Sequence, residues 1–376
     1  MAATSTVGNG GGTGSLWLRN VRWDLTFISL SAALVVLPFA AYEAFNVLLG
    51  MDGLRSAIGI DPADVLDVSR NAVNALIALL IGGPHMYATY TRTFLDRDFR
   101  SRHVPFLAGS LVIPFGVVYL GVNHFQVLIT LFFFWASVHV LHQIAYIIDC
   151  YNRRSPTARS LAWRALDYVV VFSSLYPLAA WRMIHGNFKI GQIEILFPPF
   201  LRLDRFPVLG WGFFGLTVAV FGGSLVLWLA RSWTEHREGR LHGPKALLMG
   251  LTIVVAFFIP SYHELDVAFQ GFNTWHSFQY LGLTLYINQL RQRKTGIATP
   301  FVRNLSAPGK GWRFYLFNVG CSLGAVSLIT TLLVLAGKGV IGLSFDQCYY
   351  VVVLSFLLMH YYHDHLLFAN TEAVVE

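Results

Sequence analysis

The chain has few charged residues and very little cysteine. Of its 376 residues, 12% are charged and three are cysteines, whereas soluble domains carry about 25% charged residues. A charged fraction this low excludes an ordinary soluble globular enzyme. The cysteines are scattered and form no C-x-x-C pair. Their spacing therefore excludes a disulfide framework and a thiolate metal site.

Lysine is also scarce, and its placement excludes one class of membrane protein. A retinal-binding pump needs a lysine in the middle of a helix to form its Schiff base. Here all the lysines lie in predicted loops or at span ends: Lys189, Lys245, Lys294, Lys310 and Lys338. Residues 1–18 lack a basic stretch followed by an apolar run. We therefore expect no cleaved signal peptide and a disordered Gly/Ser/Thr-rich tail over 1–18.

Hydrophobic residues are abundant, at 55% of the chain. Apolar runs of about 20 residues, the length that crosses a bilayer as a helix, recur from Leu25 almost to the C-terminus. They predict an all-α, polytopic integral membrane protein with about ten helices in one bundle over 19–370, followed by a short tail over 371–376. The predicted spans lie near 24–49, 71–92, 104–122, 126–150, 162–183, 208–231, 245–262, 266–290, 314–336 and 345–368.

The net charge of +7 is concentrated in alternate connections between the predicted spans. The basic connections are 92–102, 153–164, 231–245 and 291–313, and Arg19 and Arg22 precede the first span. Because basic loops stay on the cytoplasmic side, both termini are predicted to be cytoplasmic. The positive charge is thus explained by the orientation of the spans in the membrane. We therefore expect no nucleic-acid partner. We expect a location in the lipid bilayer of a bacterial inner membrane.

Histidine is the residue type that asks for a chemical explanation. Seven of the thirteen histidines lie inside predicted spans that all run in the same direction, and His365 is off the face that His360 and His363 share. The other six are His85, His139, His142, His276, His360 and His363. At about 1.5 Å per residue they lie at similar depths, between about 10 and 22 Å from the inner border. Residues three apart share a helix face, so each of the two pairs can converge on one point. The pattern predicts a metal centre with these six residues as ligands.

Polar neighbours of these histidines are candidates to line the pocket or transfer protons. Tyr87, Tyr90, Gln279 and Tyr280 are predicted in that catalytic role. Thr89 is expected to orient His85, because metal-bound imidazoles usually donate their second N–H to an acceptor. The sequence leaves open whether the site also includes His263, His365, Asp149 or Asp364.

An all-nitrogen site of this kind suits non-haem iron best, with copper or haem as alternatives. A centre buried beside lipid would receive an apolar substrate from the bilayer and use oxygen away from water. We therefore hypothesise a metal-dependent oxidoreductase or oxygenase acting on a lipid, hydrocarbon or isoprenoid, with an electron donor as a partner.

Two resemblances accompany this hypothesis. The segments HVLHQ and HYYHDH resemble the histidine boxes of membrane fatty-acid desaturases and hydroxylases. Those boxes lie in cytosolic extensions, whereas these segments lie inside predicted spans, so no residue role is transferred. The layout of isolated intramembrane histidines is also similar to that of the bacterial carotenoid-cleaving dioxygenases that make retinal, by layout alone.

Two other functions use the same features differently. Axial histidine pairs from facing helices would make a haem-binding electron-transfer protein. A metal or small-molecule transporter would use acidic groups near the midplane and broken helices. The candidates for these features are Glu43 in the first span and Pro84, which directly precedes His85.

Overall fold

The computed structural model describes residues 16–155, 160–337, 339 and 342–369. Within that part of the chain, regular structure is helical except for an antiparallel hairpin of β1 (Lys189–Ile190) and β2 (Ile193–Glu194). The predicted all-α fold is confirmed. Residues 1–15 of the predicted N-terminal tail and the whole predicted C-terminal tail, 371–376, lie outside the described residues.

The end of the predicted N-terminal tail is packed, so the prediction of disorder is wrong there. Leu18 is 1% exposed, and its backbone N–H donates to Asp24 at 2.8 Å. Tyr151 donates to the same carboxylate at 2.8 Å, and Tyr286 donates to the carbonyl of Leu18 at 2.9 Å. The long-range partners of this segment lie far along the chain, where local composition gives no sign of them.

Eight helices in the described part of the chain are long and apolar enough to cross a membrane, which supports an integral membrane protein. They coincide with eight of the ten predicted spans. Their bounds are Val21–Gly50, Pro62–Tyr90, Val104–Asn123, Phe125–Arg154, Pro207–Arg237, Gly243–Ser261, Gly311–Gly337 and Gln347–Phe368.

The other two predicted spans differ from these eight for separate reasons. Over 162–183 the chain forms two short helices, α10 (Leu161–Ser173) and α11 (Tyr176–Ile184). Pro177 lies in the first turn of the second helix, where its missing N–H is tolerated. Over 266–290 the chain forms one long helix, α14 (Leu265–Lys294), which is rich in buried polar residues. The total of ten spans and the side of the termini stay predictions.

Several of the spans are built from consecutive helical segments. The first contains α1 (Val21–Trp23), η1 (Asp24–Ser29), η2 (Leu30–Val35) and α2 (Val36–Gly50). The second contains η3 (Pro62–Asp64), α4 (Val65–Ile77), η4 (Ala78–Gly82) and α5 (Gly83–Tyr90). The remaining elements are α3 (Asp52–Ile58), α6 (Arg97–Arg102), α7 (Val104–Ser110), α8 (Val112–Asn123), α9 (Phe125–Arg154), η5 (Pro199–Leu201), α12 (Pro207–Arg237), α13 (Gly243–Phe258), η6 (Ile259–Ser261), α15 (Pro300–Leu305), α16 (Gly311–Gly337) and α17 (Phe345–Phe368).

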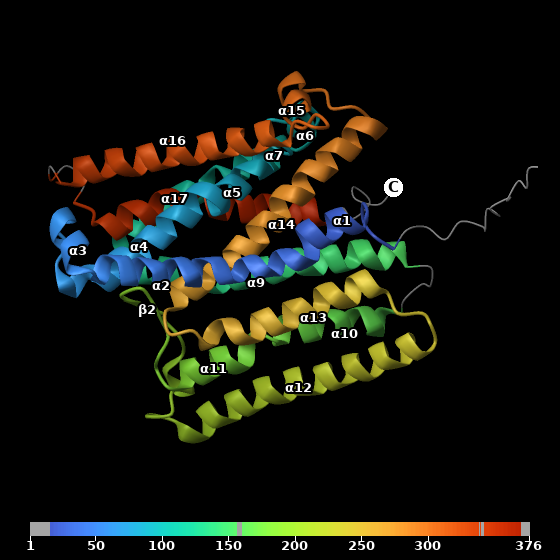
Figure 1. Cartoon of the computed structure of the whole chain (residues 1–376), viewed down its shortest axis with the longest axis horizontal. Coiled ribbons are helices and arrows are strands. Elements are labelled where there is room, and N and C mark those ends of the chain that lie inside the picture. The colour runs from blue at the N-terminus through green and yellow to red at the C-terminus, as the bar shows by residue number, and fades with distance from the viewer. Residues whose placement is uncertain (1–15, 156–159, 338, 340–341, 370–376) are drawn as a thin grey trace, which may run out of the picture.

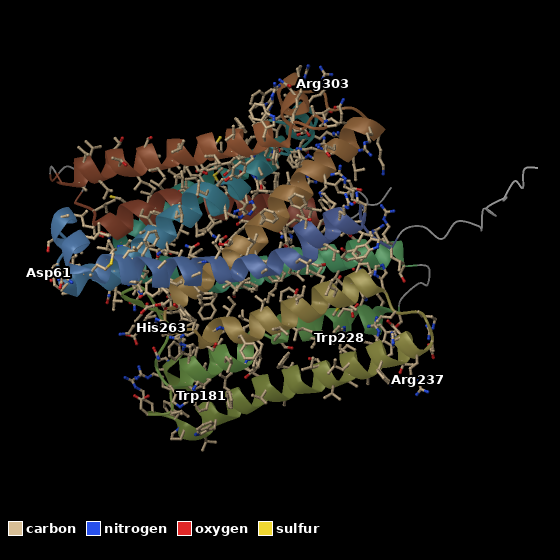
Figure 2. All side chains as sticks on the ribbon, viewed as in Figure 1. Asp61, Trp181, Trp228, Arg237, His263 and Arg303 are labelled. Atoms are coloured by element: carbon tan, nitrogen blue, oxygen red, sulfur yellow. The ribbon has the colours of Figure 1, made fainter. Side chains whose placement is uncertain are left out.

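The long helices run lengthwise through the molecule, with α14 crossing its middle (Figure 1). Helices α10 to α13 form a layer on one side, and α16 lies at the opposite edge. Arg237 and Arg303 lie at one end of the bundle, and Asp61 and His263 lie at the other (Figure 2). The helices α5, α9, α14 and α17 all run toward the end that carries the arginines. The four helices that carry the predicted ligands are therefore parallel in direction, as the sequence predicts.

The helix that carries His85 does not break at Pro84. A π-helical turn, η4, leads directly into α5. Proline lacks an N–H and so leaves the carbonyl four residues earlier without its helical donor. That carbonyl, of Leu80, accepts a hydrogen bond from the Tyr315 hydroxyl at 2.7 Å. Helix α16 thus supplies the missing donor, and the helix continues through the proline.

Gly82 and Gly83, directly before Pro84, allow this helix to approach its neighbours closely. A Cβ on Gly83 would lie 2.3 Å from both the Ala78 carbonyl oxygen and Ser322 Oγ. A Cβ on Gly82 would lie 2.9 Å from the Asn273 side chain. The glycines therefore set how closely α5 packs against α14 and α16.

Replacing Gly83 by alanine should destabilise the fold, because backbone at 2.3 Å must move to admit the new methyl group. The expected cost is about 1–3 kcal/mol, the range for overpacking a tight interior. It should lower the thermal unfolding midpoint of the detergent-purified protein. Gly222→Ala is the matched control, since a Cβ at Gly222 would meet nothing within 4 Å. Equal midpoints for the two variants would contradict the close approach.

Candidate metal centre

Four of the predicted histidines meet in the middle of the bundle. One comes from each of α5, α9, α14 and α17, and each is buried, at no more than 4% exposure. Their rings form a closed circle in which each ring neighbours the next. The distances between ring centres are 5.0 Å for His85–His276, 5.0 Å for His276–His139, 5.1 Å for His139–His360 and 4.7 Å for His360–His85.

A carboxylate completes this group. Asp364 lies one helical turn after His360 and is 0% exposed. Its Oδ2 atom is 3.5 Å from His360 Nε2 and 3.7 Å from His139 Nε2. These separations are too long for good hydrogen bonds. The atoms instead surround a common point, so Asp364 is a candidate ligand beside the four imidazoles.

The atoms that face this point have no hydrogen-bond partner. They are the Nε2 atoms of His85, His139 and His360, both ring nitrogens of His276, and Oδ2 of Asp364. Leaving a buried polar atom unpaired costs about 1–3 kcal/mol, and here such atoms come from five neighbouring residues. Two overlapping groups, His85/His276/His360 and His139/His360/Asp364, each hold their ligand atoms within 4.8 Å of one another. Metal–nitrogen bonds near 2.0–2.1 Å keep the ligand atoms of one ion within about 4 Å of one another. Each group comes close to that spacing, and the two groups share His360.

No family model, curated protein or solved structure matches the chain. The function must therefore be argued from the geometry of the site.

Hydrogen bonds on the far side of two rings fix their orientation. His85 Nδ1 contacts the carbonyl of Gly82 and lies 2.8 Å from Ser277 Oγ. His360 Nδ1 lies 2.5 Å from Thr89 Oγ1. Occupied Nδ1 atoms leave Nε2 as the free nitrogen, which is the arrangement that metal-bound histidines adopt.

Tyr280 belongs to the same network. Its hydroxyl donates to Asp364 Oδ1 at 2.6 Å and lies 2.6 Å from Thr89 Oγ1. Thr89 in turn contacts His360. The phenol thus holds one oxygen of the carboxylate and leaves the other, Oδ2, facing the centre. Of the four residues predicted to be catalytic, Tyr280 is the one that lies at the centre.

The other three residues predicted to be catalytic lie elsewhere. Tyr90 donates to the carbonyl of Phe356 at 3.2 Å, and the Tyr87 ring packs on Phe356 at 5.4 Å between ring centres. Gln279 donates to the carbonyl of Ile28 at 2.6 Å and accepts from Gln143 at 3.1 Å. These contacts join helices to one another. They place the three residues in packing roles.

The structure does not bring His142 and His363 to the circle. Both nitrogens of His363 are occupied, Nδ1 by Thr93 at 3.2 Å and Nε2 by Ser110 at 3.0 Å. The His142 ring instead faces His365, at 6.3 Å between ring centres. Three residues of helix advance about 4.5 Å along the axis. The second histidine of each pair therefore lies at a level where α5 and α14 offer no imidazole.

The structure places the four residues whose membership of the site the sequence leaves open. Asp364 joins the centre. Asp149 pairs with Arg164 at 3.0 Å, His263 packs on the Tyr262 ring, and His365 is exposed. Those three lie outside the group.

Sequence reasoning missed one residue of the site and assigned another to the wrong histidine. Ser277, which contacts His85, follows His276 directly but points to a different helix face, so only the packing of α5 on α14 reveals it. Thr89 is expected to serve His85, which lies one turn earlier on its own helix. It contacts His360 of α17 instead. Helical spacing gives neighbours within one helix and does not give partners across two.

Proposed function

We propose that the chain is a metal-dependent oxidoreductase of a bacterial inner membrane that oxidises a hydrophobic substrate with O₂. The observation that carries the proposal is that five neighbouring buried residues, in two groups that share His360, have ligand atoms without hydrogen-bond partners. Ionisable and polar groups are costly at membrane depth and mark functional sites there. Here each of four different helices contributes a buried histidine, which favours a functional site over chance packing.

Iron is the metal that we propose, with copper as the alternative. Imidazole suits both metals, and a mixed set of histidines and a carboxylate is typical of non-haem iron sites that use oxygen. Two axial imidazoles of a haem face each other across the porphyrin plane, whereas the four rings here close a circle with 4.7–5.1 Å between neighbouring ring centres. The spacing therefore favours one ion over a porphyrin.

The chemistry requires that water stays out and that protons can be supplied. Bound iron would supply the oxygen activation. The chain holds the ligands on four helices, and the full burial of His360 and Asp364 keeps bulk water away. Inserting one atom of O₂ into a C–H bond, with the other leaving as water, consumes two electrons and two protons. An electron donor is then a partner, and the hydroxyl of Tyr280 is placed to pass a proton toward Asp364.

The transporter alternative has less support from the positions of its two candidate residues. Glu43 is exposed and accepts a hydrogen bond from Tyr262 at 2.8 Å, at the end of the bundle that carries His263. The helix continues through Pro84. Carriers place acidic groups and broken helices near the midplane.

The test of the proposed function is elemental analysis and spectroscopy of the purified protein, followed by oxygen uptake. We expect about one iron or copper ion per chain, no Soret band, and O₂ consumption when a lipid extract and a chemical reductant are both present. A Soret band would select a haem protein. A metal-free protein that moves metal ions across vesicle membranes would select the transporter.

Tyr280→Phe should weaken metal binding without removing it. The variant deletes the hydroxyl that donates to Asp364 and contacts Thr89, while the ligand atoms themselves remain. Loss of such an outer partner costs about 10–100-fold in metal affinity or activity. Competition with a chelator of known affinity measures the change. Tyr90→Phe is the control, since its hydroxyl bonds only a backbone carbonyl away from the centre, and an equal loss in both variants would contradict this role.

A further inference from the structure

A cavity reaches the candidate metal centre from the end of the bundle that carries Asp61. The cavity is open on one side and contains about 60 Å³ of space, and His85 is part of its wall. Much of the wall is formed by residues that precede the metal-site histidines on α14 and α17, together with Gly83 and Met86 on either side of His85 in α5. A molecule in this cavity would therefore contact a candidate ligand of the metal.

One wall of the cavity is polar and is linked to His85. Asn273 donates to Gln270 Oε1 at 3.1 Å, and Ser277 donates to Asn273 Oδ1 at 3.1 Å. Ser277 Oγ also lies 2.8 Å from His85 Nδ1. Because Gln270 uses its carbonyl oxygen in this chain, its amide N–H groups are the donors available to a ligand. A ligand oxygen at Gln270 would thus be connected to the metal site by hydrogen bonds.

The charge on this wall disfavours an anionic ligand. Asp266 is 3.0 Å from Arg70, and Arg70 is also 2.9 Å from Asp67. Asp266 lines the cavity, and Arg70 is shared between Asp266 and Asp67. The net charge of this group of two carboxylates and one guanidinium is therefore negative. Asn74 lies 3.5 Å from Asp266 and adds only a neutral amide. A carboxylate or phosphate would meet repulsion here, whereas a neutral hydroxyl or carbonyl would not.

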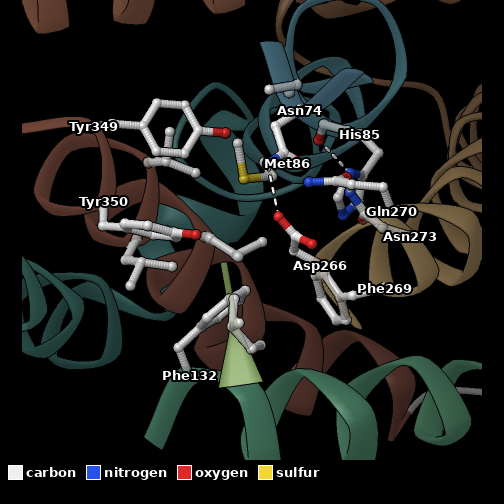
Figure 3. A pocket seen from close by; sticks show the side chains of 17 residues that line it. Asn74, His85, Met86, Phe132, Asp266, Phe269, Gln270, Asn273, Tyr349 and Tyr350 are labelled. Atoms are coloured by element: carbon white, nitrogen blue, oxygen red, sulfur yellow. Dashed lines mark hydrogen bonds between the residues drawn. The ribbon is translucent and has the colours of Figure 1, made fainter. Parts of the chain in front are cut away.

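The opposite wall is aromatic and aliphatic. Figure 3 shows Asn273, Gln270 and Asp266 on the side of His85, and Tyr349 and Tyr350 across from them. The rings and aliphatic side chains that line the opposite wall include Phe132, Tyr349, Tyr350, Leu354 and Leu357. Such a surface favours a hydrocarbon chain.

A second cavity lies beside the first and is almost entirely apolar. Its wall includes Phe133, Phe188 and Phe272. Phe269 lines both cavities. This ring therefore forms a partition between the space next to the metal centre and additional room for hydrocarbon.

We propose that the first cavity binds the substrate as a hydrocarbon chain ending in a neutral oxygen group, an alcohol or an aldehyde, and that Phe269 limits the chain length. Gln270 donates to the oxygen, and the chain lies against the aromatic wall with its carbon atoms next to His85. This assignment rests on the proposed function, because it takes the metal centre as the place where the bound chain reacts.

The experiment measures binding of tritiated 1-dodecanol to the purified, immobilised full chain by scintillation proximity, with and without added iron. Unlabelled 1-dodecanol should compete at a concentration at least about tenfold lower than dodecane or ionised dodecanoate, the equivalent of one hydrogen bond of about 1.4 kcal/mol. Gln270→Leu should remove the preference for the alcohol over the alkane. Gln289→Leu, a buried glutamine at the other end of α14, should keep it.

Phe269 is tested with the same assay and a series of longer alcohols. Phe269→Ala should shift the preferred alcohol to a longer chain, because removal of the ring joins the two cavities. Phe269→Leu, which alters the core less, should shift it in the same direction by a smaller amount. An unchanged chain-length preference in both variants would overturn the role of Phe269.

The outcomes separate this inference from the proposed function. Equal competition by dodecanol and dodecanoate, or an unchanged preference in Gln270→Leu, would overturn the inference even if the protein holds iron and consumes O₂. Selective binding of dodecanol to a protein that holds no metal would support the cavity assignment and contradict the proposed oxidation.

Discussion

His360→Gln should abolish stoichiometric metal binding, whereas His363→Gln should leave it intact. His360 lies in both groups of converging ligand atoms, so its loss removes a donor that no neighbour replaces. An outer hydrogen-bond partner alone is worth about 10–100-fold in metal affinity, and loss of a ligand should exceed that range. Metal content per chain after purification, measured by mass spectrometry, gives the result directly.

His363 is a closely matched control for His360, because it lies one turn away on the same helix and is equally buried. Its nitrogens already bond Thr93 and Ser110. Replacing it should cost some thermal stability through those two bonds without changing the metal content. Equal metal loss in both variants, with equal losses of stability, would point to misfolding and contradict the four-histidine centre.

Asp364→Asn should produce the second large effect, a loss of metal affinity of about 100-fold or more. The four imidazoles are neutral when they bind a metal, so Asp364 is the one anionic group in the described circle that offsets the charge of the ion. Removing the partner of a buried charge costs about 3–5 kcal/mol. Titration of the metal-free variant with iron(II) against a competing chelator measures the change.

The same variant separates a ligand role from a structural role. A carboxylate buried without a cation is destabilising, so the metal-free variant should be at least as thermally stable as the metal-free parent. Asp149→Asn is the control, because Asp149 is bonded to Arg164 outside the centre. Unchanged metal affinity in Asp364→Asn, together with a lower unfolding midpoint of the metal-free form, would assign Asp364 to structure alone.

The sequence predicts the helices well because long apolar runs leave little choice of conformation in lipid. It misses the packed end of the N-terminal segment, where Leu18 is held by Asp24 and Tyr286. The contact between Tyr286 and Leu18 joins residues that are 268 positions apart. No local sequence pattern predicts it. The sequence also gives Pro84 as the candidate helix break of the transporter alternative, because only the packing of α16 shows that Tyr315 supplies the missing donor.

For the site, the sequence predicts the four helices that take part, and its candidate ligands include the histidine of each helix that lies at the centre. It does not distinguish the two members of each i, i+3 pair. His139 and His360 are indistinguishable by spacing from His142 and His363, and only the helix rotations and the depths of His85 and His276 separate them. The polar wall of the cavity is not predicted from the sequence either. Gln270, Asn273 and Ser277 are linked to His85 only by the packing of α14 on α5.

X-ray absorption at the metal edge of the purified protein tests the central claim most directly. We predict about four nitrogen ligands with the scattering pattern of imidazole and one oxygen ligand, at bond lengths near 2.0–2.2 Å. This pattern is the one expected if the two groups that share His360, namely His85/His276/His360 and His139/His360/Asp364, hold a single ion. A protein without bound metal after iron and copper loading, or a metal without imidazole ligands, would contradict the account.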